Sequence, residues 1–569
     1  MSASHPQPLQ VVFCWHMHQP YYKGAGMSDY QLPWVYLHGI KDYADMAAHL
    51  ENNPDAKAVV NFAPVLLEQL DDYAQQLEAW LDRGILIGDP LLAALAGPGL
   101  PVDNKSRREI VQACLRANEH RLIHRFRHFE ELAKLARHAL EHPITVAYLN
   151  DQFLVDLLVW YHLAWVGECS RINDLRLRSL QSKGHGFSND DRRRLVELIW
   201  EILSTLTPRY SRLAKNGQVE LSVTPYAHPI MPLLIEMQSA KEAFPGIHMP
   251  KLEAYPGGEA RARWHIRKGI EVFEKHFGFR PHGCWPSEGA LSEATAKMLE
   301  EEGFEWAATG QQVLSNSLMA SSHGGHLPEN WVHKAYRLFE GRLNLFFRDD
   351  GLSDLIGFTY GEWHADDAVG DLINHLVNIA EACKGNPQAV VSIIMDGENA
   401  WEYYPKNGSY FLDAMYARMA EHPRLQLTTF SETQHRAQRL APKLGRLVAG
   451  SWVYGTFTTW IGDKDKNRAW DLLGQAKRDY DEALKTRSYS AERLEALERQ
   501  LAICEGSDWF WWFGDYNPGA TVSDFERLFR HQLSYLYKLM EIPQPDNLKH
   551  VFAVGSGDPS LGGVMRKND

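Results

Sequence analysis

Two acidic residues that each follow a strand-like segment form a candidate catalytic pair. In IIMDGENAWEYYPKNG, residues 393–408, a β-branched run leads into Asp396 and aromatic residues follow. In GCWPSEG, residues 283–289, Trp285 precedes Glu288, and the glycine after the acid allows close backbone approach. Such a pair suits glycoside hydrolysis, because one carboxylate can act as nucleophile while the other, kept protonated in a water-poor pocket, donates a proton.

Glu288 has a second interpretation from its neighbours alone. Ser287 could cap a helix, and an acid directly after the cap would interact favourably with the helix dipole. The residue types leave both interpretations open, and the separation of Glu288 from Asp396 along the chain does not show whether the two meet in space.

Two histidines close to the N-terminus form a second candidate site. In HMHQP, residues 16–20, His16 and His18 are two positions apart, so both would point to the same face of a strand. They could bind a metal, hydrogen-bond a polar ligand or be structural. Metal binding is the weakest of the three, because no acid or cysteine lies close in sequence.

Another polar group lies in VELSVTPYAHP, residues 219–229. Glu220 stands inside the strand-like part, and Tyr226 and His228 stand at its end. An acid that points into the mouth of a barrel could bind hydroxyl groups or a neighbouring histidine.

Strand-like and helix-like segments alternate along much of the chain, which predicts parallel β/α units. Several strand-like segments end in polar or acidic residues, where a β/α barrel places its chemistry. An open doubly wound sheet would give the same local pattern. The strand-like segments are LQVVFCWHMHQPYY, AKAVVNF, VELSVTPYAHP, FRPHGCWPSEG, FEWAATG, LNLFFRD and AVVSIIMDGEN.

Helical patterns dominate two regions of the sequence. Apolar residues recur every three or four positions from about 81 to 213, and Ser490 is placed to cap a helix in the C-terminal part. We therefore predict a catalytic barrel over residues 1–435 with a helical insertion at about 81–213. A mostly helical domain over 436–545 and a loose, glycine-rich tail over 546–569 follow.

Composition limits the class of protein. A net charge of −13 argues against a surface that follows phosphates, so we expect no nucleic-acid partner. The 18 Trp and 23 Tyr suit sugar ligands, although they would also fill a large core. The six cysteines include no CxxC pair, and neither a signal-peptide pattern nor a membrane-spanning apolar run is present. We expect a cytoplasmic protein without a membrane partner.

Four segments resemble, in order, the first four sequence motifs of glycoside hydrolase family 57. They are HMHQP at 16–20, GQVEL at 217–221, WPSEG at 285–289 and MDGENAWEYYP at 395–405. CEGSDWFWWFGDYN at 504–517 resembles the looser fifth motif, and linking segments resemble the α-amylase and amylopullulanase-like branch. The resemblance covers about residues 10 to 540.

The resemblance implies an incomplete (β/α)7 barrel and a retaining mechanism on α-glucans, with no cofactor and no metal. Glu288 matches the nucleophile and Asp396 the general acid/base. It implies α-1,4 links of glycogen, starch or maltodextrin as substrates and leaves open whether α-1,6 links are cleaved as well. The positions that it assigns to substrate binding are His16, His18, Gln19, Glu220, Tyr226, His228, Trp285, Arg348, Asp349, Trp401, Tyr404, Asp508, Trp509 and Trp511.

Other functions remain open at this point. A 4-α-glucanotransferase or a glycogen branching enzyme of the same family would use the same two carboxylates. A metal-dependent deacetylase or mannosidase-like hydrolase would need His16 and His18 to hold a metal together with an Asp, and the residues between and after them are Met17 and Gln19. A non-catalytic glucan-binding protein would keep the fold without the chemistry.

Overall fold

A central parallel sheet organises the protein. The computed structural model describes residues 7–24, 26, 29–97, 99–321, 327–338, 341–437 and 441–557. The strand order is β7-β5-β4-β3-β2-β1-β8, β9 also pairs with β1, and every one of these pairings is parallel. The strands are β1 (Leu9–Met17), β2 (Ala58–Phe62), β3 (Val219–Val223), β4 (Gly283–Cys284), β5 (Trp306–Thr309), β7 (Asn344–Phe347), β8 (Val390–Asp396) and β9 (Leu425–Leu427).

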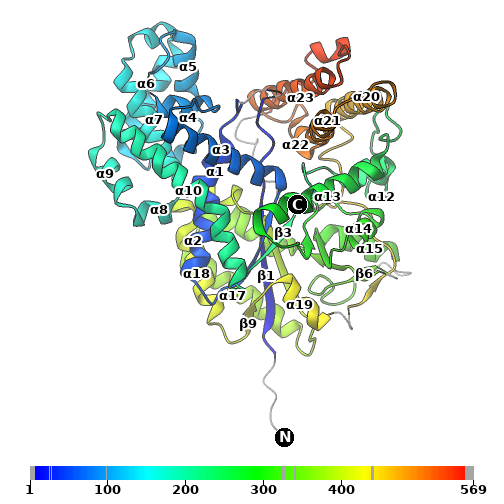
Figure 1. Cartoon of the computed structure of the whole chain (residues 1–569). Helices are drawn as coiled ribbons and strands as arrows, with labels where there is room; N and C mark the ends of the chain where they lie inside the picture. The colour runs from blue at the N-terminus through cyan, green and yellow to red at the C-terminus, as the bar shows by residue number, and fades with distance from the viewer. Residues whose placement is uncertain are drawn as a thin grey trace.

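Helices lie around this sheet, with β1 running through the middle of the molecule (Figure 1). Every residue of β1 and β2 is buried, which is why these strands read as continuous apolar runs rather than alternating ones. The register sets His16 beside Asn61 of β2 and beside Asp396 of β8. Polar groups from three neighbouring strands therefore meet at the carboxyl edge of the sheet.

The two ends of the strand order come together just beyond β7. Arg348, the residue after β7, forms an isolated parallel bridge with Ser392 of β8, and the Asp349 amide donates to the Ser392 carbonyl at 2.8 Å. A seven-strand path whose ends meet at an isolated bridge is an incomplete barrel. The predicted fold class, an incomplete (β/α)7 barrel with helical insertions and C-terminal helices, is confirmed.

A long helical segment separates β2 from β3. Its first helix, α3, starts at Pro64, whose fixed backbone angle suits a first helical position, and ends at Arg83, which Gly84 follows with a left-handed φ of 68°. Its last helix begins with a capping box between Ser188 and Asp191. The helices are α3 (Pro64–Arg83), α4 (Pro90–Ala96), α5 (Asn104–Ala113), α6 (Arg127–Glu141), α7 (Asp151–Trp165), α8 (Glu168–Asn173), α9 (Leu175–Lys183) and α10 (Asn189–Lys215).

The other barrel helices follow individual strands. Helices α1 (Trp34–His38) and α2 (Ala44–Asn52) follow β1, and α11 (Met231–Ile235), α12 (Ala240–Ala243) and α13 (Gly258–Phe277) follow β3. The remaining ones are α14 (Glu293–Glu301), α15 (Gln311–Ser321), α16 (Asp350–Asp354), α17 (Ala365–Ala382), α18 (Ser409–Ala420) and α19 (Phe430–Ala437). A separate two-stranded sheet pairs β6 (Arg337–Leu338) with β10 (Lys443–Leu444).

The C-terminal part contains α20 (Lys464–Thr486), α21 (Ala491–Cys504), α22 (Ser507–Trp512) and α23 (Gly519–Met540). Ser490 caps α21 by accepting from the Arg493 amide, as predicted. Of the tail predicted to be loose, residues 546–557 include the buried Ala553, and Phe552 packs on Phe513; residues 558–569 lie outside the described ones. The domain boundary near residue 435 stays a prediction.

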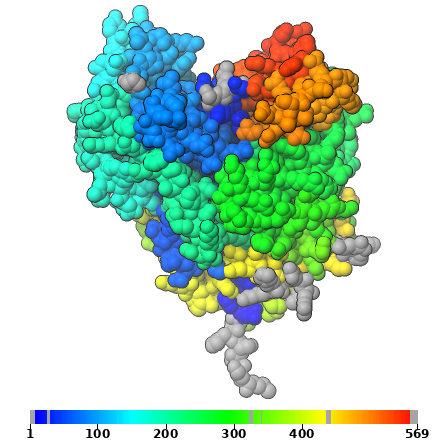
Figure 2. Space-filling view, viewed as in Figure 1, coloured from blue at the N-terminus to red at the C-terminus, as the bar shows by residue number. Residues whose placement is uncertain are grey.

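Two helical groups rise at one end of the barrel. Helices α4 to α7 stand on one side and α20 to α23 on the other (Figure 1). The space-filling view shows a notch between them (Figure 2). Within the described residues, no helix combines the length and the apolar character that crossing a membrane requires.

Candidate active site

A cavity of about 440 Å³ lies at the carboxyl ends of the barrel strands. Glu288 and Asp396, which the sequence pairs as catalytic acids, both line it. The structure thus brings together two residues more than a hundred positions apart. The predicted site residues that line the cavity are His16, His18, Gln19, His228, Glu288, Arg348, Asp396, Asp508 and Trp511.

Glu288 lies in a tight turn after β4 rather than at the start of a helix. Its φ of 57° is left-handed, which is uncommon for a residue with a side chain. The following helix, α14, is capped by Ser292, so the capping interpretation of Ser287 is wrong. The Trp452 indole Nε1–H donates to Glu288 Oε2 at 3.0 Å, and the Trp452 amide donates to the Glu288 carbonyl at 3.1 Å. The first bond orients the carboxylate, and the second ties the backbone of the turn to the segment that carries Trp452.

Asp396 is the last residue of β8 and also lines the cavity. Burial raises the pKa of Asp396 to about 6, although the Asn399 side-chain amide, which donates to Oδ2 at 2.8 Å, acts in the opposite direction. A carboxyl group with this pKa carries its proton in about half of the molecules at pH 6 and in roughly a tenth at pH 7. It can therefore donate that proton to a leaving group.

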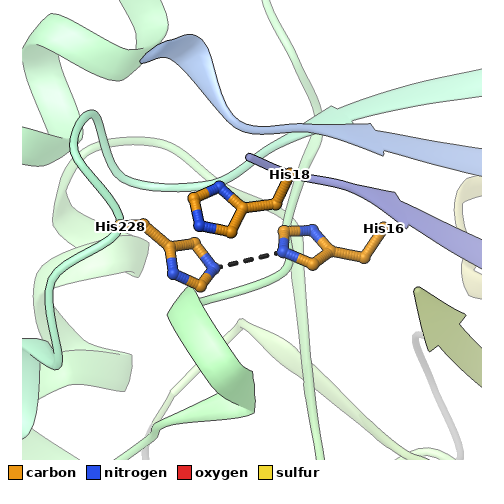
Figure 3. A group of neighbouring side chains, drawn as sticks. All are labelled: His16, His18 and His228. Atoms are coloured by element: carbon orange, nitrogen blue, oxygen red, sulfur yellow. Dashed lines mark hydrogen bonds between the residues drawn. The ribbon is translucent and has the colours of Figure 1, made fainter. Parts of the chain in front are cut away.

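Three histidine rings line the floor of the cavity (Figure 3). The ring nitrogens of His16 and His228 are 3.1 Å apart, and His16 Nδ1 is 2.7 Å from Asn61 Oδ1. His228 Nδ1 lies 2.8 Å from the Ser507 hydroxyl. Because an amide oxygen only accepts, His16 donates to Asn61 and accepts from His228, which leaves His228 Nδ1 to accept from Ser507.

This chain of hydrogen bonds requires both imidazoles to be neutral. Burial lowers the pKa of His16 to about 3 and that of His228 well below its usual value, with the neighbouring His18 adding to both shifts. His228 also takes a left-handed φ of 59°. Two fixed, uncharged rings beside the carboxylate pair are suited to hydrogen-bonding a polar ligand.

The same three histidines are the strongest candidate for a metal site in the cavity, because their ring nitrogens lie within 4.8 Å of one another. The rings of His18 and His228 are stacked, with centroids 3.8 Å apart and planes 15° apart. Nitrogen lone pairs lie in the ring planes, so those of stacked rings do not converge on one ion. His16 and His228 also already spend both nitrogens on hydrogen bonds. The arrangement fits hydrogen bonding better than metal coordination.

The C-terminal helices complete the cavity. His18 Nε2 lies 2.8 Å from Asp508 Oδ1, so the residue that follows β1 meets α22 at the wall. Ser507, the neighbour of Asp508, reaches His228, and both Trp511 and Trp512 line the cavity. The fifth-motif segment therefore contacts the barrel's polar residues directly.

Among the lining residues that the sequence prediction missed, Trp452 and Glu398 lie beside the two candidate catalytic acids. Trp452 lies outside the motifs, in GSWVYGTF, and nothing local marks it. Glu398, two positions after Asp396, is 2% exposed and accepts from the Gln19 side chain at 3.4 Å. Burial and the nearby Asp396 charge raise the pKa of Glu398 well above its usual value. A second acid so close to a catalytic candidate was a signal in the sequence.

Glu220 was expected at the mouth of the barrel and lies elsewhere. It is the second residue of β3, so it sits at the amino end of the strand, away from the cavity. It accepts from Trp306 Nε1 at 2.7 Å and from the Ser431 amide at 2.9 Å. These contacts tie β3 to β5 and to α19, which is a structural function.

Tyr226 and Asp349 also lie beside the cavity wall rather than on it. The Tyr226 hydroxyl donates to Glu68 at 2.8 Å and accepts from Arg499. Asp349 caps α16 by accepting from the Leu352 amide, and it pairs with His333.

Four aromatic residues predicted to bind substrate pack in the core instead. Trp285 is 0% exposed and lies beneath the cavity, 5.2 Å from the Trp452 ring. Trp401 donates to the Gly397 carbonyl, Tyr404 donates to the Ile356 carbonyl, and Trp509 donates to the Ile503 carbonyl. These last three rings satisfy their polar atoms on backbone oxygens, which is how buried Tyr and Trp are usually accommodated.

Solved structures share the fold over nearly the whole chain. A family 57 branching enzyme from Thermococcus kodakaraensis has a TM-score of 0.56 at 16% identity, covering 93% of this chain and 89% of that one. One from Pyrococcus horikoshii has a TM-score of 0.54 at 16% identity, covering 97% and 99%. An alpha-amylase from Thermotoga maritima has a TM-score of 0.54 at 13% identity, covering 94% and 97%. Likeness at these identities establishes the fold alone.

No curated protein sequence gives a match. The model of one protein family, described as glycosyl hydrolase family 57, matches residues 12–444, which is well over half of the chain. Glu288, Asp396 and the histidine group all lie within the matched residues. The chain therefore belongs to glycosyl hydrolase family 57, as the order of its motifs predicts.

Proposed function

We propose that the protein is a retaining glycoside hydrolase that acts on α-glucans, with Glu288 as nucleophile and Asp396 as general acid and base. One observation carries the proposal. Both carboxyl groups line the same cavity, and burial raises the pKa of Asp396 to about 6 while Trp452 donates to Glu288. The two acids thus have different environments and can take different roles.

In the first step, Glu288 attacks the anomeric carbon of the bound sugar. The bond to the glycosidic oxygen breaks, and Asp396 gives its proton to that oxygen as the leaving sugar departs. The ionised Glu288 also stabilises the positive charge that develops on the sugar ring. The products are a covalent glycosyl-enzyme and an Asp396 carboxylate.

In the second step, the Asp396 carboxylate takes a proton from water, and the water oxygen attacks the anomeric carbon. Glu288 is released as a carboxylate and Asp396 recovers its proton. Two inversions at the same carbon retain the configuration of the sugar.

The histidine group offers hydrogen bonds for sugar hydroxyls. His18 lines the cavity and bonds Asp508 through Nε2, while its Nδ1 is buried and has no hydrogen-bond partner among the described residues. A buried ring nitrogen without a partner costs free energy that a bound hydroxyl would recover. We therefore assign His18 to substrate binding.

The substrate class is proposed from two observations together. The linking segments resemble the amylase and amylopullulanase-like branch, and the structures with the same fold include an alpha-amylase and two branching enzymes. Hydrolysis and transfer share both carboxylates and differ in whether water or a second glucan reaches the intermediate. We propose hydrolysis of α-1,4 links, with pullulan as the substrate that reveals α-1,6 cleavage.

A product profile tests the proposal. The purified protein is incubated separately with maltoheptaose, soluble starch, glycogen and pullulan, and short maltooligosaccharides of retained configuration are expected. Chains longer than the maltoheptaose supplied would instead identify a glucanotransferase or branching enzyme.

Two Glu→Gln variants provide the matched control. Glu288→Gln should abolish the products. Glu220→Gln changes an acid at the amino end of β3, away from the cavity, and should leave the products in place. Unchanged glucans with the native protein would overturn the proposed chemistry.

A further inference from the structure

An ion pair joins the two helical groups at the cavity. Arg116 follows α5 and Asp524 belongs to α23, 408 residues later in the chain. The Arg116 guanidinium lies 3.3 Å from the Asp524 carboxylate, and both residues line the cavity. Figure 1 shows α5 and α23 on opposite sides of the barrel end, so the pair connects two facing walls.

The Arg116 side of this contact is fixed to the barrel. The Tyr161 hydroxyl of α7 donates to the Arg116 carbonyl at 3.3 Å. A few residues further on, the Asn118 side chain donates to the Glu402 carbonyl at 3.1 Å and Arg121 Nε donates to the Tyr403 carbonyl at 2.8 Å. Glu402 and Tyr403 belong to the loop that follows Asp396. The segment around Arg116 is therefore attached to the rim of the cavity.

The Asp524 side is equally well placed. Asp524 accepts a second hydrogen bond from Arg527, one turn further along α23, at 3.1 Å. Thr521 and Phe525 of the same helix line the cavity, and Phe525 stacks on Trp512 with ring centroids 5.3 Å apart. Asp524 thus projects from a helix whose face already forms the wall.

We propose that the Arg116–Asp524 pair is a bar across the entrance of the cavity, which makes the enzyme select for glucan chain ends. This inference rests on the proposed function. A linear chain can pass beneath a bar end first. The interior of a long chain, or a ring without ends, can enter only when the pair is broken.

The Arg116–Asp524 ion pair is strong enough to affect which glucan chains enter the cavity and weak enough to break reversibly. The side chains are 39% and 22% exposed, so water and salt screen the attraction between them. Exposed ion pairs of this kind are typically worth a two- to fivefold change in a population. Removing the pair should raise access for chains without free ends by about the same factor.

Two substrates of equal size and different topology isolate this property. Maltoheptaose and the cyclic heptamer of α-1,4-linked glucose have the same sugar units, but the cyclic form has no ends. The measurement is the ratio of kcat/KM on the cyclic substrate to kcat/KM on the linear one. Arg116→Gln and Asp524→Asn should each raise this ratio about two- to fivefold, and the double variant should raise it no further.

Three controls separate the bar from a general effect. Arg527→Gln removes the other partner of Asp524 and should leave the ratio unchanged. The charge-exchanged variant Arg116→Asp with Asp524→Arg should restore the native ratio. Raising the salt concentration to about 1 M should increase the ratio for the native enzyme and not for Arg116→Gln.

The outcomes are distinguishable from failure of the proposed function. If the native enzyme cleaves maltoheptaose and the ratio is the same in all variants, the bar is refuted and the hydrolase stands. If Glu288→Gln retains cleavage of the linear substrate, or the native enzyme has none, the proposed function fails and the bar fails with it.

Discussion

Two buried carboxylates in different parts of the molecule have opposite protonation behaviour. Asp396 lies in the cavity at the end of β8, where burial raises its pKa to about 6. Glu505 lies at the junction of α13 and α21, and it binds Arg261 through Nε and Nη2 and lies 2.8 Å from His265 Nε2. Burial also raises the pKa of Glu505, but Arg261 and His265 outweigh it and bring the pKa down to about 2.

The difference teaches that burial alone does not decide what an acid does. Glu505 is ionised at neutral pH because a cation and two further donors surround it, including the Tyr255 hydroxyl at 2.6 Å. It anchors the segment that carries Ser507 and Asp508 into the cavity. Asp396 has one amide partner and a pKa of about 6, so it can gain and lose its proton near neutral pH and exchange it with substrate. The acid at the helix junction stabilises the fold and is unreactive, whereas the acid in the cavity is reactive and costs stability.

The largest expected effect is the loss of activity when the carboxyl group of Asp396 is removed. Asp396→Asn should lower kcat/KM on maltoheptaose about 10²- to 10⁴-fold, because the leaving sugar loses its proton donor. The free energy of unfolding at pH 7 should not fall, since the substitution removes a carboxyl group that burial disfavours in its charged form.

An aryl glycoside with an acidic phenol as leaving group provides the control. Formation of the glycosyl-enzyme then needs little protonation, so the variant should form it at close to the native rate. An equal loss on both substrates would show that Asp396 is not the proton donor.

The next prediction concerns the junction. Glu505→Gln leaves the Arg261 guanidinium buried without its counter-charge, and this should lower the free energy of unfolding by about 3–5 kcal/mol. Glu498→Gln, a change of the same kind on α21 at a half-buried acid that accepts from Trp264, should lower it by less than about 1 kcal/mol. Urea unfolding measures both. A small loss at Glu505 would mean that the network does not hold the two helices together.

The two acids should change the free energy of unfolding in opposite directions as pH rises. The pKa of Asp396 is raised in the folded state, so its contribution to stability is complete below about pH 4 and is lost as pH rises through about 6. The change is up to about 3 kcal/mol. The pKa of Glu505 is lowered, so its contribution is present above about pH 4.5 and is lost as pH falls toward 2. Activity should fall with Asp396 deprotonation.

Unfolding and kcat/KM measured from pH 3 to 9 check both slopes. In Asp396→Asn the decline of stability between pH 4 and pH 7 should become smaller, while the acid-side decline remains. If the native enzyme instead gained stability relative to the variant through this range, the pKa of Asp396 would not be raised in the folded state.

Sequence reasoning predicted the features that local chemistry determines. Apolar runs ending in polar residues located β1, β3 and β8, and their carboxyl ends carry His16, His228 and Asp396 into the cavity. The parallel order follows from alternation with helices. Glu220 shows where this reasoning fails. It lies at the amino end of β3, but a strand-like segment alone does not reveal at which residue the strand begins.

Contacts between distant segments were not predictable in this way. Trp285, Trp401 and Trp509 share the residue type expected for sugar binding, and the depth of packing that makes them core residues depends on the whole fold. Trp452 is the opposite case, because it was not expected in the site and the fold places it there. It reaches Glu288 from a segment without regular structure, and its role depends on how that segment crosses the barrel end.

The two tryptophans beside Glu288 provide the smallest and most local comparison. Trp452 donates to the Glu288 carboxylate. The Trp285 ring is in edge contact with the Trp452 ring, with centroids 5.2 Å apart, and its Nε1 has no hydrogen-bond partner among the described residues. Trp452→Phe removes a hydrogen bond to a charged group, so kcat/KM should fall about ten- to hundredfold with little change in unfolding. Trp285→Phe leaves a void beneath the cavity and should reduce stability by about 1–3 kcal/mol while the rate changes less. If both variants lose stability and neither loses rate, the Trp452 bond is part of the packing and not of the chemistry, and Glu288 is positioned by its backbone alone.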